Sequence, residues 1–262
     1  MEPQCRVFGR LTSNELGTLN RNLAANAVYL YSGDERPLGW FSDQTAFHFY
    51  VPPGTYRFKA YSSEAHEVSG TVTVPPDQAE LEIGTINLAA KRWALLRGQP
   101  APEFQEVVAW KNSEPLKLSD LRGNVVLLEF WGYWCGPCVG RMADLFSVYD
   151  KYRDQGLVII GIHLDTGEGI DSPAKLDEKL AEIKNRLWKG RDIPFPVALV
   201  LEHQVPFRAD VERKAGCPLA ADYGIDSVPT GVLIDRQGRV VDTYYAGRDS
   251  DEAVLLKTMA GN

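Results

Sequence analysis

One stretch of the sequence, Val125–Cys138, restricts the fold of this chain more than any other. Its first six residues are apolar except for Glu129, which is the pattern of a β-strand covered on both faces. Pro137 then suits the first turn of a helix, because the N–H that proline lacks would have no partner there. The stretch therefore predicts a buried strand that runs directly into a helix, with Cys135 and Cys138 at the junction.

The predicted helix begins at this pair of thiols. Its apolar residues recur at spacings of four and three, as one face of a helix requires: Met142, Leu145, Tyr149 and Tyr152. Cys135 should lie where free backbone N–H groups and the positive end of the helix dipole favour a thiolate. Cys138 follows one turn later, close enough to form a disulfide with it. An exposed, activated thiol beside a second thiol that can resolve its mixed disulfides is the geometry of reversible dithiol–disulfide exchange.

The composition indicates a globular protein with two domains. The chain has 262 residues, 44% of them hydrophobic, which supplies two cores at roughly 100–200 residues per domain. The net charge is −7 and no basic stripe is present, so neither a nucleic acid nor an anionic membrane is an expected partner. No apolar run approaches the ~18 residues that span a membrane. Four cysteines, two of them closely spaced, do not form a disulfide-stapled scaffold.

The start of the chain shows no basic segment followed by an apolar one, so no export signal is visible. Two interpretations stay open. The protein is cytoplasmic, or it is the mature or trimmed form of an exported one, whose membrane association would need a segment absent from this chain.

Residues 1–90 alternate in the manner of β-strands and predict a small β-sandwich. Turns rich in Gly, Pro, Ser and Asp separate the expected strands: Val7–Leu11, Ala27–Tyr31, Leu38–Phe41, Ala46–Val51, Thr55–Tyr61, Val72–Val74 and Leu81–Leu88. This half carries no catalytic constellation, and His48 and His66 are expected to be structural. Four aromatic residues are expected to pack in the core, with binding of a partner or a sugar as the alternative: Trp40, Phe41, Phe47 and Tyr50.

Residues 91–99 break both periodicities and are expected to be a linker, with residues 100–262 as a second domain. Its strands Val125–Phe130 and Leu157–Ile162 flank a helix, and such a βαβ unit makes them parallel. A further helix from Pro173 should turn Leu176, Leu180, Ile183 and Leu187 inward. The remaining expected elements are strands Val107–Trp110 and Val197–Leu201, a helical turn Leu219–Tyr223, a hairpin of Gly231–Asp235 with Arg239–Tyr245, and a helix Asp249–Met259. Residues 202–216 form an insertion of no clear type, and the whole is a mixed sheet with helices on both faces.

The motif FWGYWCGPC, Phe130–Cys138, resembles thioredoxins and the related extracytoplasmic thiol–disulfide oxidoreductases of the TlpA/ResA type. Further matches are Pro100–Phe104, Leu118–Gly123, Tyr223–Ile225, Val228–Thr230 and the hairpin that begins at Ile234. The resemblance covers about residues 99–260 and favours the TlpA-like branch of the AhpC/TSA-related redoxins. In the first half, Val51–Tyr56 resembles the PPGxY turn of carboxypeptidase-regulatory-like, transthyretin-type sandwich domains.

This resemblance implies an α/β thioredoxin fold behind the all-β sandwich and a thioredoxin-like protein-disulfide oxidoreductase that acts as a reductant. The implied partners are protein thiols or disulfides and an upstream reductant, and no cofactor is expected. The implied location is extracytoplasmic, in the bacterial periplasm or cell envelope.

The resemblance also assigns roles to residues. Pro229 matches the family's cis-proline, which faces the disulfide, so that Val228 offers its backbone to an extended substrate peptide beside Cys135. Three further residues are expected at the substrate groove: Trp134, Gly136 and Pro137. Gly247 fits the family's small groove residue, and a plain turn glycine is nearly as good an interpretation.

Glu129 occupies the position where thioredoxins bury an acid behind the second cysteine. Inside an apolar strand its pKa should be raised, and it could relay the proton to and from Cys138. The alternative is a carboxyl that faces a polar edge. The lysine that thioredoxins place on the neighbouring strand is missing, because that strand reads Ile160–His163, IGIH.

Three other functions were weighed against dithiol exchange. A zinc site would need Cys5, Cys217 and His203 to join the two motif cysteines, since no second CxxC pair exists, so no metal is expected. A peroxiredoxin would carry Thr three residues before the reactive cysteine, where this chain has Gly132. An adaptor, in which the sandwich docks a partner and the redox site is vestigial, is suggested by the size of the first half.

Overall fold

The computed structural model describes residues 4–33, 37–207 and 210–261 and divides into two compact units, residues 1–95 and 96–262. Each unit has hydrophobic core residues of its own. The division falls inside a short helix, α2 (Arg92–Leu96), so the expected linker 91–99 is partly helical. Ala94 and Leu96 of this helix are buried, and that is why a segment without a recognisable period is nevertheless ordered.

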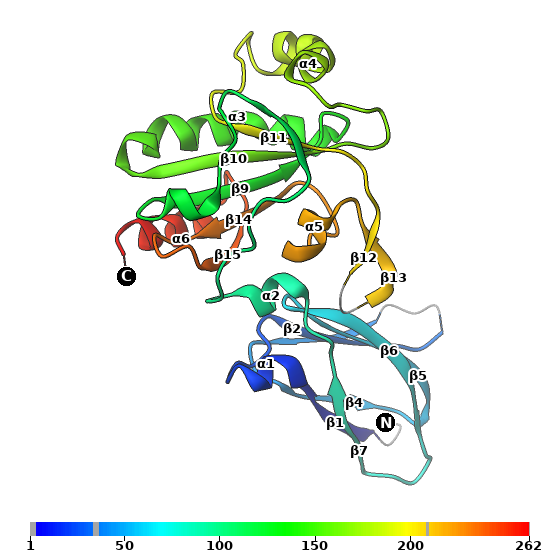
Figure 1. Cartoon of the computed structure of the whole chain (residues 1–262). Helices are drawn as coiled ribbons and strands as arrows, with labels where there is room; N and C mark the ends of the chain where they lie inside the picture. The colour runs from blue at the N-terminus through cyan, green and yellow to red at the C-terminus, as the bar shows by residue number, and fades with distance from the viewer. Residues whose placement is uncertain (1–3, 34–36, 208–209, 262) are drawn as a thin grey trace. The chain divides into compact units, whose positions relative to one another are not determined.

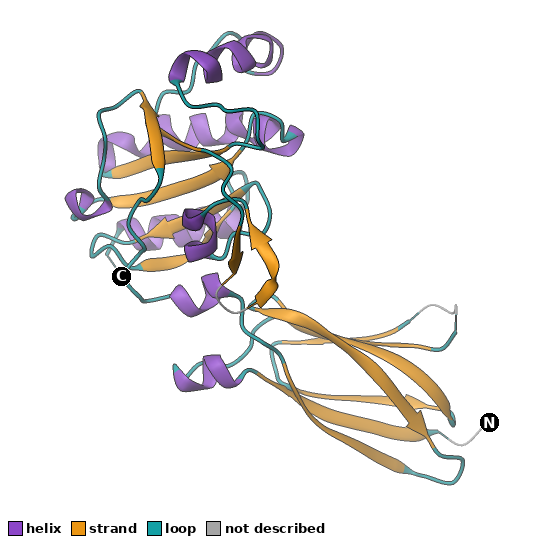
Figure 2. Ribbon diagram, turned by 45° about the vertical axis from the view of Figure 1, so that its right-hand side comes forward, coloured by secondary structure: helices purple, strands orange, loops and turns teal. Residues whose placement is uncertain are grey.

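The first unit is a β-sandwich (Figure 2). One sheet has the order β4-β1-β7 and the other the order β3-β2-β5-β6. The strands are β1 (Cys5–Thr12), β2 (Asn26–Tyr31), β3 (Leu38–Ser42), β4 (Ala46–Val51), β5 (Gly54–Ser62), β6 (Ala65–Val74) and β7 (Glu80–Asn87). Every expected strand is present, and β6 begins well before Val72 because it pairs with β5 from Ser62↔Ala65 onward. A short helix, α1 (Asn14–Thr18), was not expected.

The aromatic residues of this unit divide between core and surface. Phe47 is buried and Trp40 packs against the core, as expected. Phe41 is 65% exposed and Tyr50 56% exposed, so the expectation of core packing is wrong for both. The reason is alternation: β4 turns Phe47 and Phe49 inward, which forces Tyr50 outward.

The second unit is built on a six-stranded mixed sheet with the order β15-β14-β9-β10-β11-β8 (Figure 1). Its strands are β8 (Val107–Lys111), β9 (Val125–Trp131), β10 (Leu157–Leu164), β11 (Val197–Val200), β14 (Thr230–Ile234) and β15 (Val240–Tyr244). The central strands β9, β10 and β11 are parallel, and β8, β14 and β15 run antiparallel to their neighbours. The stretch 202–216 adds a hairpin of β12 (Val205–Phe207) and β13 (Asp210–Ala215).

Helices cover both faces of this sheet. On one face, α3 (Gly136–Tyr152), α4 (Pro173–Leu187) and α6 (Asp249–Met259) pack into a core with Leu127 and Trp131 of β9. On the other, α5 (Pro218–Tyr223) and the 3-10 turn η1 (Leu118–Leu121) pack against Leu128 and Phe130. A second 3-10 turn, η2 (Arg153–Gln155), follows α3. This is the expected thioredoxin fold behind an all-β unit.

Helix α4 differs from expectation at its end. Leu176 and Leu180 are fully buried and Ile183 is partly buried, but Leu187 is 52% exposed. Leu187 is the last helical residue, and the next one, Trp188, fills the core instead and donates its indole N–H to the carbonyl of Val139. Within the described chain, no helix has both the length and the apolar character needed to cross a bilayer.

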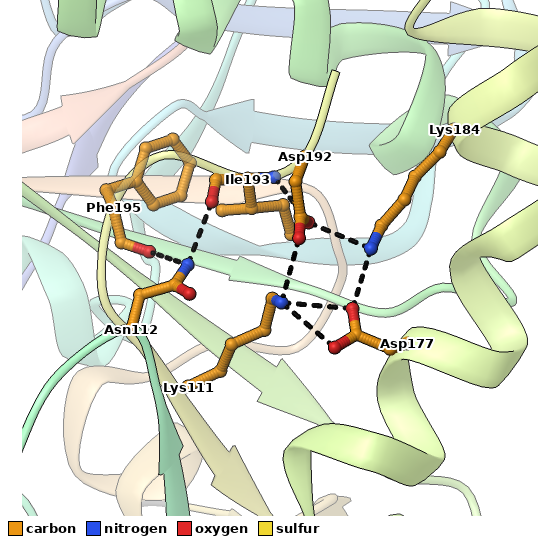
Figure 3. A network of polar contacts seen from close by, with 7 residues as sticks. All are labelled: Lys111, Asn112, Asp177, Lys184, Asp192, Ile193 and Phe195. Atoms are coloured by element: carbon orange, nitrogen blue, oxygen red, sulfur yellow. Dashed lines mark hydrogen bonds and ion pairs between the residues drawn. The ribbon is translucent and has the colours of Figure 1, made fainter. Parts of the chain in front are cut away.

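A network of alternating charges holds α4 to the edge strand β8 (Figure 3). The Lys111 ammonium at the end of β8 lies 3.0 Å from carboxylate oxygens of Asp177, on α4, and of Asp192, before β11. Lys184 contacts the same two carboxylates at 2.6 and 3.0 Å. The Lys111 side chain is only 7% exposed, so its buried charge is stabilised by the two carboxylates.

Hydrogen bonds fasten the start of the second unit to the rest of its fold. The carboxylate of Glu103 accepts the backbone N–H groups of Leu118 at 2.7 Å and Ser119 at 3.1 Å, which begin η1. The hydroxyl of Tyr223 donates to the carbonyl of Pro102 at 2.7 Å. These bonds fasten the segment before β8 to two elements that are distant in sequence.

Candidate active site

The two motif cysteines lie at the junction of β9 and α3 and are joined by a disulfide, with Cα atoms 5.2 Å apart. Cys135 is the N-cap of α3, and its sulfur accepts the backbone N–H of Cys138 at 3.2 Å. An N-cap side chain satisfies one of the N–H groups that the first turn leaves free. The strand-to-helix junction and the pairing of its two sulfur atoms are thus as expected.

Accessibility at the disulfide differs from expectation. Cys135 is 7% exposed and Cys138 is 2% exposed, so the expected exposed thiol is largely covered in this oxidised form. The sulfur of Cys135 is bonded to Cys138 and also lies 3.8 Å from the carbonyl oxygen of Val228. Of the two sulfur-bearing residues, Cys135 still has the greater access to solvent.

The loop before β14 contacts the disulfide. The Val228–Pro229 peptide bond is cis, as expected. A disulfide sulfur has no hydrogen to donate, so the 3.8 Å approach of Val228 to Cys135 is a van der Waals contact. The backbone of Val228 therefore borders the disulfide.

Residues beside Cys135 leave an open surface. Trp134 is 44% exposed and is oriented by its indole N–H, which donates to the carbonyl of Leu164 at 3.1 Å. Gly136 and Pro137 are also exposed at the first turn of α3. A partner can therefore approach the disulfide across these three residues.

Gly247 has a different environment. Its φ of +87° lies in the left-handed region that favours glycine. A Cβ added there would lie 3.0 Å from a carboxylate oxygen of Asp144, in the middle of α3. Its backbone conformation alone explains the glycine, which favours the turn interpretation, and the groove role stays a prediction.

Glu129 lies on the face of β9 that packs against α3, the helix that begins at the two cysteines. It is 1% exposed, so the alternative of a polar edge is wrong. Burial raises its pKa to about 7, and the nearby charge and hydrogen bond of Arg141 act in the opposite direction. Arg141 donates from Nη2 to Oε1 of Glu129, whereas Oε2 has no hydrogen-bond partner among the described residues.

Arg141 was not anticipated from the sequence. Its side chain is 2% exposed, and its guanidinium lies over the ring of Tyr245, 4.0 Å from the centroid. Two signals pointed to it: it falls on the inner face of the helix, three residues after Cys138, and a carboxyl inside an apolar strand needs a cation. The period of apolar residues along the helix does not reveal a buried arginine, because arginine is polar.

The neighbouring strand β10 supplies no cation to Glu129. The residue opposite Glu129 in register is Gly161, and a Cβ there would lie 2.9 Å from the indole nitrogen of Trp131. His163, two residues on, is fully buried with its ring 5.2 Å from that of Trp131. Burial lowers the pKa of His163 to about 4, so its ring is neutral at pH 7.

The other cysteines lie apart from this site. Cys5 is buried in the sandwich core, and Cys217 is the buried N-cap of α5, where it accepts the N–H of Ala220 at 3.4 Å. In the part of the chain that the structure describes, no cluster of three or more His, Cys, Asp or Glu side chains could hold a metal ion.

The sequence profile of the AhpC/TSA family matches residues 97–246, more than half of the chain. The chain belongs to the AhpC/TSA family. The thiol-disulfide oxidoreductase ResA of Bacillus cereus is 32% identical to this AhpC/TSA protein over 155 residues, 59% of the chain and 73% of the relative. The protein of the same name from Bacillus subtilis is 29% identical over 152 residues, 58% of the chain and 69% of the relative.

Among solved structures, a thiol-disulfide isomerase from Corynebacterium glutamicum covers 62% of this AhpC/TSA protein and 97% of its own chain, at 24% identity and a TM-score of 0.44. At that score the likeness adds nothing to the family match. The expected class, a thioredoxin-like oxidoreductase among the TlpA/ResA-like redoxins, is confirmed. The match begins at residue 97, so the kinship of the sandwich with carboxypeptidase-regulatory-like domains stays a prediction.

Proposed function

We propose that this protein exchanges disulfides with protein substrates through Cys135 and Cys138 and acts as a reductant. The observation that carries the proposal is a disulfide at the N-cap of α3, beside the backbone of Val228. The same proposal includes an upstream reductant and a location in the bacterial periplasm or cell envelope, both of which rest on the TlpA/ResA resemblance.

The first step uses the reduced protein. The thiolate of Cys135 attacks one sulfur of the substrate disulfide, a mixed disulfide forms, and the other substrate sulfur leaves as a thiolate that takes up a proton. The Cys138 N–H that Cys135 accepts, together with the positive end of the helix dipole, favours the thiolate form of Cys135.

The second step resolves the mixed disulfide. The Cys138 thiol gives its proton to Glu129, and its sulfur attacks that of Cys135. The bond to the substrate breaks, and the second substrate sulfur leaves and is protonated. The substrate has then gained two electrons and two protons, and the dithiol has become the disulfide. The upstream reductant restores the dithiol by the reverse exchange.

The substrate peptide is proposed to lie extended across the open surface beside Cys135. Its backbone would pair with that of Val228, next to Pro229, and its side chains would contact Trp134 and Pro137 and pass over Gly136. The exposure of Trp134, Gly136 and Pro137 and the short approach of Val228 to the sulfur support this path.

An insulin-reduction assay tests the proposal. Wild type should reduce insulin, and Cys135→Ser should abolish the activity. Cys217→Ser is the matched control, because serine can also cap α5 and Cys217 lies in a different core from the disulfide. Full activity in Cys135→Ser, or none in wild type, would refute the proposal.

Peroxide reduction is a second candidate because of the family match. A peroxiredoxin needs a threonine where this chain has Gly132, and a Cβ at Gly132 would lie 2.5 Å from the indole of Trp134. No threonine side chain fits there while Trp134 keeps its position, so slow peroxide consumption is expected in stopped-flow measurements. Fast consumption would favour this candidate instead.

The adaptor with a vestigial redox site is the third candidate. It predicts a Cys135 thiol with ordinary reactivity, whereas dithiol exchange predicts a thiol of lowered pKa. The rate of alkylation of Cys135 against pH, measured on the reduced protein, separates the two.

A further inference from the structure

A buried ion pair joins α3, the helix that begins at the two cysteines, to the strand β9. Arg141 and Glu129 each have side chains only 2% exposed. A charge buried alone in a protein interior costs several kcal/mol, so the guanidinium and the ionised carboxyl stabilise each other. Arg141 follows Cys138 by three residues on α3, and residues at that spacing are neighbours on a helix surface. Arg141 thus lies within one helical turn of Cys138.

The pair is incompletely satisfied. A full arginine–carboxylate fork uses two N–H groups and both oxygens. Here Oε2 of Glu129 and both Nε and Nη1 of Arg141 are buried without a hydrogen-bond partner among the described residues. One free acceptor and two free donors therefore remain in the interior. A buried polar atom without a hydrogen-bond partner is costly in a salt bridge whose role is only structural. A site of proton exchange, in contrast, requires such an atom.

The guanidinium is fixed in place from its other side. The ring of Tyr245 covers it at 4.0 Å, while its Nη2 donates to Oε1 of Glu129. On β14, Gly231 lies opposite Glu129 in register, and a Cβ there would come within 3.1 Å of Oε2. Space for the free oxygen is thus provided by the absence of a side chain at Gly231.

Arg141 is the charged group that acts on Glu129. From β10, His163 is neutral at pH 7 because burial lowers its pKa to about 4. From β15, burial raises the pKa of the Tyr244 phenol to about 12, so it too is neutral. Gly231 of β14 has no charge to offer. Arg141, on α3, supplies a positively charged guanidinium.

We propose that Arg141 is a positioning residue for dithiol exchange: it holds the carboxyl of Glu129 behind Cys138 and supplies the fixed positive charge against which that carboxyl exchanges its proton with the thiol. The inference rests on the proposed function, because it concerns the resolution step. The positive charge that acts on Glu129 would then lie on α3, the helix that begins at Cys135 and Cys138.

Stopped-flow reaction of the reduced protein with Ellman's reagent isolates this step. Attack by Cys135 releases one aromatic thiolate at a rate proportional to reagent concentration. Attack by Cys138 on the resulting mixed disulfide releases a second one at a rate independent of concentration. The pH profile of that second phase should show a wild-type inflection near pH 7, from Glu129. In Arg141→Gln the inflection should move up by about 1–3 pH units, the usual effect of losing an adjacent opposite charge.

Control variants separate a charge effect from a general disturbance. Arg141→Lys keeps the charge and should stay closer to the wild-type inflection. Arg191→Gln removes an arginine that pairs with Asp150 at the far end of α3, at 2.7 Å, and should leave the profile unchanged. In a Glu129→Gln background the inflection should be absent with or without Arg141.

Three outcomes would overturn the inference: an unmoved inflection in Arg141→Gln, an equal shift in Arg191→Gln, or a shift that persists in the Glu129→Gln background. A measurement on wild type keeps the test open if Arg141→Gln does not fold. The NMR chemical shift of the Glu129 carboxyl carbon should change over the same pH range as the rate of the second phase. A change centred on the ordinary pKa of glutamate would refute the role. A wild type without any second phase would instead refute the proposed function.

Discussion

Replacing Glu129 by glutamine should change how the stability of the second unit depends on pH. The folded-state pKa of Glu129 is about 7 because burial disfavours its charge, against an ordinary value of 4.5. Between these values the folded protein keeps a proton that the unfolded chain has released. Glu129 therefore contributes stability that is fully present below about pH 4.5 and is lost as the pH rises through 7.

The magnitude follows from the difference of the two values. The shift from 4.5 to about 7, at 1.36 kcal/mol for each pKa unit, corresponds to about 3 kcal/mol. Glu129→Gln has no proton to lose and should show none of this decline. In the variant Arg141 faces a neutral amide at every pH, so this position adds no pH dependence to the stability of the variant.

Chemical denaturation of both oxidised proteins, repeated at intervals between about pH 4.5 and about pH 8, measures the effect. The free energy of unfolding of wild type should fall relative to that of the variant by about 3 kcal/mol across the range. The low pKa of His163 makes stability depend on pH in the same way in both proteins, and it cancels in the difference. Parallel curves would show that Glu129 is ionised throughout, and the reasoning from burial would be refuted.

Four further substitutions test the packing of the second unit by the same denaturation measurement. Leu180→Ala should cost about 2–5 kcal/mol of stability because the side chain is fully buried. Leu187→Ala, on the exposed end of the same helix, should cost less than about 0.5 kcal/mol. Equal losses would contradict the burial pattern of α4. Gly231→Ala should destabilise by about 1–3 kcal/mol, since its Cβ would lie 2.5 Å from the carbonyl oxygen of Tyr244. An unchanged denaturation midpoint would contradict the pairing of β14 with β15 at this position. Lys111→Met should cost about 1–3 kcal/mol by leaving two carboxylates without one of their cations, and a more stable variant would show that the network is dispensable.

Much of the fold could be predicted because apolar residues recur at the spacing of a strand or of one helix face. The buried strand Val125–Phe130, the helix after it and the closing hairpin are local patterns with strong periods, and each is confirmed. Helix α2 and the hairpin in residues 202–216 are too short to show a period, so tertiary contacts decide their structure. Leu187 has the spacing of a core residue, but the helix ends there and Trp188 takes the core position.

The site was predictable to the extent that it depends on backbone geometry. The position of the two cysteines and the bond before Pro229 follow from a short motif and the family that it resembles. The partner of Glu129 does not follow in this way. An arginine on a helix face is usually solvated, and only the packing of β9 against α3 shows that Arg141 turns inward.

The small size of Gly161 has a consequence for how the chain can vary. The indole of Trp131 occupies the space beside Glu129 that a long side chain on β10 would need. A sequence can therefore place either a bulky indole or a strand-borne cation at that point, but not both. Because the positive charge is carried on the same helix as Cys138, the distance between sulfur and guanidinium is set by a single helical turn rather than by the alignment of two strands. Substitutions in β10 are therefore restricted by packing alone.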